Sequence, residues 1–433
     1  MKKLLSILLC GALLLTGCGT SNNENTMGQL PIDSSNDVTK IKFWYAYTDK
    51  IQENNENMVK KFNDTVGKEK GIEVIAEYQG AYDDVHQKLQ AAHISGEVPA
   101  ISVMEIASIE TFANNGLITP LDEYIQKDNV NISDFYEGLL ENCVVNDNFY
   151  GLPYLRSTPI LYLNTTLLNE AGLNPEGPKT WEELETYART IKEKTGKYGI
   201  SMYSYEWVLE GFFLQHGTSI LSEDRKTTNL NTDEGKKIFT FFQNLAKDNI
   251  IRTHSGGDSS KVSADILNQN AAMWFASTAD LTKNLQIAEE NNFEINTAFL
   301  PKAKEYGVPT GGCNLVITSK ASDKEKEAAW EFIKWITSPE QAAISTVTTG
   351  YVPTSKAVVE TEEIQNLFKE RPQFKVALDQ LESYGHGRPM NKEYIEAKKE
   401  LTNVMDAVFV NLKDVNEILK TYQEKIDNIL QGK

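Results

Sequence analysis

The stretch IKFWYAYTDKIQENNENMVKKFNDTVGKEKGIEVIAEY, residues 41–78, decides the fold class of this chain. Its first part, residues 41–47, is rich in β-branched and aromatic side chains and predicts a buried strand. Met58 and Phe62 then stand one helical turn apart, and residues 72–78 predict a second strand. A strand, a helix and a strand in this order form a right-handed βαβ unit, whose parallel strands are covered by helices. The stretch therefore predicts an α/β fold.

The same alternation of strands and helices continues along the chain. Thr180 and Glu183 form the pattern of a capping box, and the helix that they begin is expected to end at Gly196. A further helix is predicted in YDDVHQKLQAAHIS, and further strands at residues 100–104, 159–164, 198–203 and 271–277.

The length of the chain indicates two lobes, because residues 39–433 exceed what one hydrophobic core usually organises. Each lobe is expected to be a mostly parallel sheet flanked by helices. We predict lobe 1 at residues 39–155 and 301–350, and lobe 2 at residues 156–300 and 351–433.

The N-terminal residues resemble a lipoprotein signal. Two lysines precede an apolar run that is shorter than the ~20 residues needed to span a bilayer, which is typical of a secretory signal peptide, here residues 1–17. LTGC, residues 15–18, resembles the lipobox of bacterial lipoproteins and implies cleavage before Cys18 and fatty acyl chains on that residue. An ordinary secreted protein, in which Cys18 is incidental, is the alternative. Residues 18–38 are polar and predict a flexible leash.

Charge, cysteines and motifs exclude several classes of protein. The formal net charge is −18 without a basic stripe, which disfavours nucleic-acid binding. Beyond the N-terminal segment only Cys143 and Cys313 remain, too few for a disulfide framework, so buried free thiols are expected although the two could pair. The histidines lack metal-ligand spacing, and no G-x-S-x-G, H-E-x-x-H or Walker motif is present. We therefore predict a binding protein, not an enzyme, with no cofactor and no metal.

Motifs that lie far apart in the chain together resemble one protein family. TWEEL at residues 180–184, SPEQAA at 338–343 after a tryptophan-rich helix and TGYVP at 349–353 resemble the extracellular solute-binding proteins of ABC importers, in their sugar-binding cluster. The resemblance implies a two-lobed periplasmic-binding-protein-like fold with a hinge between the lobes. It also implies a monomer that serves ABC permease subunits, anchored to the cell membrane by lipid and facing the extracellular or periplasmic side.

Further motifs resemble the subgroup that binds glycerol-3-phosphate and its diesters. YQGAYDDVHQKLQAA (78–92) resembles that subgroup's Y-x-G-x-Y pattern, and GLPYLRSTPILYLN (151–164) resembles Q-P-F-N-S-S-T-P-V-L-Y-Y-N. The motifs AISVMEIAS, MWFAST, TGGCNL, TGYVP and GHGRPMNKEY match other positions of the subgroup. Residue by residue, the resemblance implies ligand contacts at Tyr82, Glu105, Ser157, Trp207, Ser277, Gly312, Tyr351 and Arg388. Ser204 stands where the subgroup has a second tryptophan.

Several of these residue types suit a phosphorylated polyol. The guanidinium of Arg388 offers a bidentate fork to phosphate oxygens, and the Glu105 carboxylate accepts hydrogen bonds from hydroxyl groups. Gly312 follows Gly311, and paired glycines let backbone amides approach an anion. Ser277 suits the N-cap of a helix that starts at residue 278 equally well.

The RSTP stretch, residues 156–159, interrupts an otherwise apolar run, and its proline removes a ladder hydrogen bond. A strand that crosses between the lobes explains this break and places Ser157 beside the cleft, at the hinge that absorbs lobe closure. Trp207 and Tyr351 are core residues by default, and the resemblance implies that their rings contact the polyol carbons.

We predict a lipid-anchored substrate-binding component of an ABC importer that captures glycerol-3-phosphate or a glycerophosphodiester by lobe closure. The nearest alternative is the same fold binding a neutral di- or oligosaccharide, with Trp207 and Tyr351 as stacking platforms. A tethered glycosidase or phosphodiesterase is a remote alternative, because a chain with 61 acidic residues can supply paired carboxylates.

Overall fold

Two five-stranded sheets are the main elements of the computed structural model, which describes residues 38–257 and 259–433. Residues Val38–Lys433 form one compact unit. The predicted signal peptide, Cys18 and the predicted leash up to residue 37 lie outside the described residues. The first sheet has the strand order β2 (Ile72–Tyr78), β1 (Thr39–Tyr45), β3 (Ile101–Glu105), β13 (Gly311–Ile317) and β6 (Leu152–Ser157). The second has the order β11 (Ile295–Ala298), β7 (Pro159–Asn164), β10 (Ala271–Ser277), β8 (Tyr198–Tyr203) and β9 (Ile251–His254).

One strand in each sheet runs against the direction of its neighbours. In the first sheet β1 pairs parallel with β2 and β3, whereas β13 pairs antiparallel with β3 and β6. In the second, β8 pairs parallel with β9 and β10, whereas β7 pairs antiparallel with β10 and β11. The chain reaches β7 and β13 directly after crossing from the other sheet. Each of these strands therefore begins at the edge of its sheet where the other strands of that sheet end. The predicted mostly parallel α/β fold is confirmed, with this one reversed strand per sheet.

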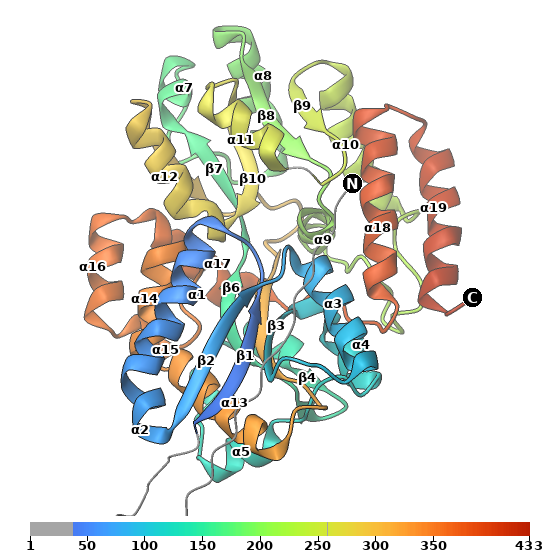
Figure 1. Ribbon diagram of the computed structural model, residues 1–433. Helices are drawn as coiled ribbons and strands as arrows, with labels where there is room; N and C mark the ends of the chain where they lie inside the picture. The colour runs from blue at the N-terminus through green and yellow to red at the C-terminus, as the bar shows by residue number, and fades with distance from the viewer. Residues whose placement is uncertain (1–37, 258) are drawn as a thin grey trace, which may run out of the picture. The chain divides into compact units, whose positions relative to one another are not determined.

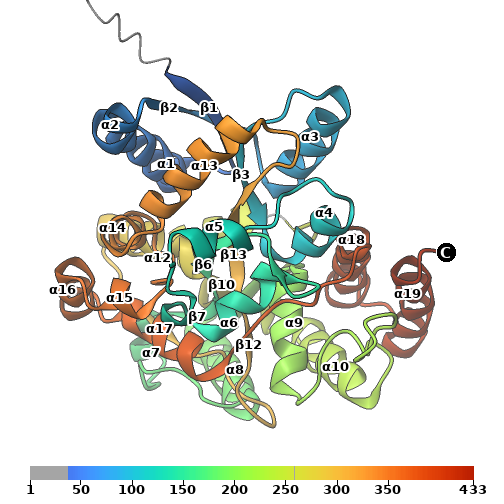
Figure 2. The ribbon, with the colours of Figure 1, turned by 90° about the horizontal axis from the view of Figure 1, so that it is seen from below.

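Helices cover the faces of both sheets (Figure 1). One core joins the first sheet to helices α1 (Asp49–Phe62), α3 (Tyr82–Ser95) and α13 (Asp323–Ile336). A second core joins the second sheet to α8 (Trp181–Thr195), α9 (Glu206–Gln215), α10 (Asp233–Lys247), α18 (Tyr394–Met405) and α19 (Val415–Leu430). A third joins β7 and β10 to α11 (Ser259–Leu267), α12 (Leu281–Glu290), α14 (Pro339–Thr349), α16 (Glu362–Glu370) and α17 (Gln373–Tyr384). Viewed from below in Figure 2, α18 and α19 lie side by side, next to α9 and α10.

The polypeptide passes directly from the first sheet to the second at residue 158. β6 ends at Ser157, β7 begins at Pro159, and Thr158 between them is fully buried. The predicted crossing strand is therefore present at the RSTP stretch. The lobe boundaries on either side of it stay a prediction.

Local signals in the sequence are largely confirmed. The Thr180 hydroxyl accepts a hydrogen bond from the Glu183 amide at 3.2 Å, and Gly196 ends the helix in the left-handed conformation with φ 72°. The Glu183 carboxylate, however, accepts from the amide of Lys179 rather than from that of Thr180, at 2.7 Å. Cys143 and Cys313 are buried free thiols, as expected.

Candidate ligand-binding cleft

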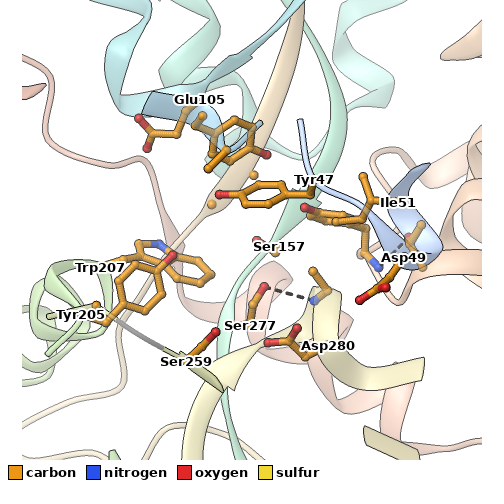
Figure 3. Close-up of a pocket in the computed structure, with 18 of the residues that line it drawn as sticks. Tyr47, Asp49, Ile51, Glu105, Ser157, Tyr205, Trp207, Ser259, Ser277 and Asp280 are labelled. Atoms are coloured by element: carbon orange, nitrogen blue, oxygen red, sulfur yellow. Dashed lines mark hydrogen bonds between the residues drawn. The ribbon is translucent and has the colours of Figure 1, made fainter. Parts of the chain in front are cut away.

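A cleft of about 1050 Å³ opens where strands of both sheets end. Its walls come from β3 and β13 of the first sheet, β8 and β10 of the second, the N-terminal turns of α1, α3 and α9, and helix α18. All eight residues predicted as ligand contacts line it, and Figure 3 shows several of them pointing toward a common space. The sequence motifs, which are up to about 300 residues apart, thus meet in one place (Tyr82 and Arg388 are the extremes).

The floor of the cleft is built from the ends of β6 and β13, where Ser157 pairs with Gly311. A side chain on Gly312 would place its Cβ 1.9 Å from the Leu155 carbonyl oxygen, and φ at this residue is +87°. A Cβ on Gly311 would lie 2.3 Å from the ring of Trp207. Gly312 is therefore required for the backbone turn, and Gly311 is required to make room for the indole.

Aromatic rings form much of the wall. The Trp207 indole is buried and donates its N–H to the Thr310 carbonyl at 2.8 Å. Tyr205 packs edge-on against it, with ring centroids 5.6 Å apart. Tyr47 meets Tyr82 edge-on at 4.9 Å. Together with Tyr203 and Tyr351, these residues present six aromatic side chains to the cleft.

Sequence reasoning missed Tyr47, Tyr203 and Tyr205. Tyr203 and Tyr205 come at the carboxyl end of β8, directly before α9. Tyr47 follows β1 and adopts φ 66°, so the predicted strand 41–47 extends two residues beyond the C-terminal end of β1. The useful signal was a tyrosine just beyond the carboxyl end of a strand, which is where ligands bind in α/β sheets.

Arg388 lies in the segment between α17 and α18 and is buried among carboxylates. Its Nε and Nη2 form a bidentate pair with Glu210 at 2.9 and 2.6 Å. Nη1 donates to Glu105 at 2.5 Å, and Nη2 also reaches Glu206 at 3.3 Å. Four of its five N–H groups therefore have carboxylate acceptors within the protein. These carboxylates hold the pKa of Arg388 well above its usual value, although burial alone would lower it.

Glu105 at the end of β3 is the centre of this ionic network. It accepts hydrogen bonds from Arg388, from Lys398 at 3.1 Å and from the Ser108 hydroxyl at 2.9 Å. Burial alone would raise the pKa of Glu105, but Lys398 and Arg388 outweigh it and hold the pKa well below its usual value. Because Lys398 comes from α18, whose apolar residues belong to the core of the second sheet, the network joins the two sides of the cleft.

Asp280 and Ser277 lie on the opposite side, at the end of β10. The Ser277 hydroxyl accepts a hydrogen bond from the Ala279 amide at 3.1 Å, as predicted for an N-cap (Figure 3). The Asp280 side chain is exposed, but it faces the confined space of the cleft, and this partial desolvation raises the pKa of Asp280 to about 6 against the opposing effect of Lys283. Lys283 also pairs with Asp49 of α1 at 3.4 Å across the cleft mouth.

A two-lobed α/β fold with a polar and aromatic cleft between its sheets is the architecture expected of a solute-binding protein. The model of bacterial extracellular solute-binding proteins matches residues 57–375, well over half of the chain. The chain belongs to this family and is a solute-binding component of an ABC transporter, not an enzyme. Within residues 38–257 and 259–433, no helix is long and apolar enough to cross a membrane.

Individual relatives are similar along most of their length. The sn-glycerol-3-phosphate-binding periplasmic protein UgpB of Yersinia enterocolitica is 26% identical over 378 residues, which cover 79% of this chain and 80% of the relative. The structure of UgpB from Mycobacterium tuberculosis in complex with glycerophosphocholine is similar with a TM-score of 0.80 at 24% identity, covering 91% of this chain and 98% of that one. Lmo0181 from Listeria monocytogenes in complex with cycloalternan gives 0.78 at 21% identity, covering 92% and 100%. The predicted resemblance is confirmed.

Proposed function

We propose that this protein captures a glycerophosphodiester in the cleft and delivers it to an ABC permease while tethered to the membrane through Cys18. UgpB relatives that bind glycerol-3-phosphate or glycerophosphocholine support the glycerol and phosphate parts of the ligand. The observation that carries the choice of a diester is the charge around Arg388.

The ionic network beside the ligand space has an excess of negative charge. Arg388 and Lys398 face three carboxylates, those of Glu105, Glu206 and Glu210. A phosphate monoester carries about −1.5 to −2 charges at pH 7, whereas a diester carries about one. Because like charges at close range oppose binding, the network disfavours the monoester more strongly than the diester.

The other side of the cleft suits the second substituent of a diester. Asp280 supplies a carboxylate, and Tyr203, which lies within the electrostatic influence of Asp280, supplies an aromatic side chain in the same cleft. A cationic head group gains from both a carboxylate and an aromatic face. A zwitterionic diester therefore complements the two ends of the cleft better than glycerol-3-phosphate does.

Capture requires that the two sides of the cleft close on the ligand. We place the hinge at the crossing of β6 into β7, since few residues connect the sheets there and such connections absorb the backbone change. Contacts from both sides then satisfy and desolvate the ligand only in the closed state.

Calorimetric titration of the mature protein with glycerophosphocholine, glycerol-3-phosphate and maltotriose tests the ligand class. We expect binding in that order of affinity, with the diester at least about tenfold tighter than the monoester, which corresponds to about 1.4 kcal/mol. Equal affinity for the two phosphoesters would contradict the charge argument.

A neutral oligosaccharide is the second candidate ligand. Six aromatic rings line the cleft, and the guanidinium of Arg388 already has carboxylate partners, which is the arrangement expected for a stacking site without an anion. Tight binding of maltotriose together with no heat from either phosphoester would decide for this candidate.

The tether has its own test. Mass spectrometry of the membrane fraction of the native host should detect a mature protein that begins with acylated Cys18. Cys18→Ser should release the protein from that fraction, because the variant lacks the thiol that carries the fatty acyl chains, and the protein then has no lipid anchor. An unmodified Cys18 in a soluble mature protein would refute the tether while leaving the ligand proposal intact.

A further inference from the structure

Arg156 is a buried cation without an anionic partner among the residues that the structure describes. It is fully buried, and its guanidinium donates to the carbonyls of Gly311 at 2.9 Å and Leu139 at 2.7 Å. The remaining bonds go to Asn314 Oδ1 at 3.0 Å and Thr310 Oγ1 at 3.1 Å. Every acceptor is neutral, in contrast to those of Arg388.

The ionisable groups that act most strongly on Arg156 do not balance its positive charge. These are the thiols of Cys143 and Cys313 and the hydroxyl of Tyr82. Burial raises the pKa of each thiol to about 11 and raises that of Tyr82 above its usual value, so all three are uncharged at pH 7. An arginine stays protonated in proteins, so a full positive charge persists here.

An unpaired buried charge is costly, because an ion taken out of water without a counter-ion loses its hydration and gains no partner. A cation of this kind in a folded protein calls for an anion that the chain itself does not supply.

The charge lies directly beneath the floor of the cleft. Nε of Arg156 donates to the carbonyl of Gly311, and the peptide group that carries this carbonyl also carries the N–H of Gly312. Both glycines line the cleft. Ser157, the next residue along β6, lines the cleft as well. A hydrogen bond to a carbonyl polarises the whole peptide group, so its N–H becomes a stronger donor.

Thr310 links the same charge to the aromatic wall. Its hydroxyl accepts from Arg156 at 3.1 Å, and its carbonyl accepts from the Trp207 indole at 2.8 Å. One peptide layer, residues 310–312, therefore separates the guanidinium from the ligand space and holds Trp207 in place.

We propose that Arg156, a positioning residue behind the cleft floor, supplies the positive field that receives the anionic group of the ligand at Ser157 and Gly312. The inference rests on the proposed function in that the ligand carries an anion. Arg388, whose charge is matched by carboxylates, then orders the cleft wall instead of receiving phosphate.

Two variants remove the field in different ways. Arg156→Gln deletes the charge, and Asn314→Asp keeps the guanidinium but places a carboxylate where Oδ1 now accepts from Nη1. Arg189→Gln is the matched control, because it removes one positive charge from a half-exposed site on α8, outside the cleft. Asn314→Asp is a second, independent perturbation if Arg156→Gln does not fold, although it removes the Nδ2–H that now donates to the Asn142 carbonyl at 2.9 Å.

The first readout is selectivity by calorimetry with glycerophosphocholine as the anionic probe and maltotriose as the neutral one. We expect both variants to lower the affinity for glycerophosphocholine at least tenfold more than that for maltotriose, and the control to change neither. An equal loss for both probes would mean that Arg156 only shapes the floor, and would overturn the proposal.

The second readout needs no ligand, so it separates this inference from the proposed function. Ser157→Cys places a thiol at the floor, and the ultraviolet absorbance of its thiolate, taken as a difference from the parent protein, gives its pKa. The pKa should be at least one unit lower in the Arg156 protein than in the protein that also carries Asn314→Asp. The same thiol pKa in both proteins would refute the field of Arg156. A lower thiol pKa in the protein without Asn314→Asp, together with no phosphoester binding by the parent protein, would refute only the proposed ligand.

Discussion

Arg388→Met should destabilise the fold rather than only weaken ligand binding. Glu210 is 2% exposed and accepts two hydrogen bonds from Arg388 and one from the Tyr394 hydroxyl at 2.6 Å. Removing Arg388 leaves this carboxylate buried with the tyrosine as its one remaining donor among the described residues. Glu105 keeps Lys398 and Ser108 as partners, so most of the loss falls on Glu210.

The expected cost follows from breaking a buried ion pair by deleting one partner, which is about 3–5 kcal/mol. Urea unfolding of the wild type, Arg388→Met, Glu210→Gln and the double variant measures it. The double variant should be more stable than Arg388→Met alone, because no uncompensated carboxylate is then buried, and the cycle should give a coupling of about 1–3 kcal/mol.

Arg388→Met with unchanged unfolding and complete loss of affinity would refute this reasoning. It would show that the guanidinium of Arg388 binds the ligand and does not stabilise the fold, as the family resemblance alone suggests. Arg189→Gln serves as the control, since its ion pairs with Glu185 and Asp248 are half-exposed and should contribute less than about 1 kcal/mol.

Three further predictions concern single sites. Burial lowers the pKa of His86 from 6.5 to about 4, so the unfolded chain binds a proton that the folded one does not, and stability should fall by about 3 kcal/mol as the pH drops through this window. His86→Phe should flatten that part of the pH profile of urea unfolding. Because the pKa of Asp280 is about 6, calorimetry should show the affinity for glycerophosphocholine rising with pH through this value, and Asp280→Asn should abolish the rise. Gly312→Ala forces a Cβ to within 1.9 Å of the Leu155 oxygen at a φ of +87°, and should lower the free energy of unfolding by more than about 2 kcal/mol.

Each of these has a clear contrary result. A His86→Phe protein that loses stability with falling pH as the wild type does would assign the effect to other groups. An affinity for glycerophosphocholine that is flat across pH 6 would remove Asp280 from the head-group site. Gly312→Ala unfolding like the wild type would show that the floor can shift to accept a methyl group.

Much of the fold was predictable from local patterns. Strands such as Ile72–Tyr78 and Pro159–Asn164 were predicted with the bounds they have, because apolar periodicity and flanking turns are read directly from neighbouring residues. The cleft residues were predicted through family motifs, since residues such as Tyr82 and Arg388 meet only in three dimensions. The reversed direction of β7 and β13 was not predicted, because strand polarity depends on how the chain crosses between the sheets.

The charges around the cleft could not be predicted in the same way. Glu206 and Glu210 stand one turn apart on α9, which marks them as one helix face but not as partners of Arg388. Likewise, the sequence shows Arg156 only as a polar break in a strand, because its lack of an anionic partner depends on which side chains surround it. Tertiary electrostatics are decided by distant residues, and single-sequence reasoning has no access to them.

The ion network has a consequence for how the protein is made. Glu105 meets its two cations only when residues 388 and 398 have been synthesised, long after β3 itself. A polypeptide that stops before residue 388 lacks both cations, so its Glu105 carboxylate has neither of these ion-pair partners. The network that joins the two sides of the cleft can therefore form only after nearly all of the chain has been translated.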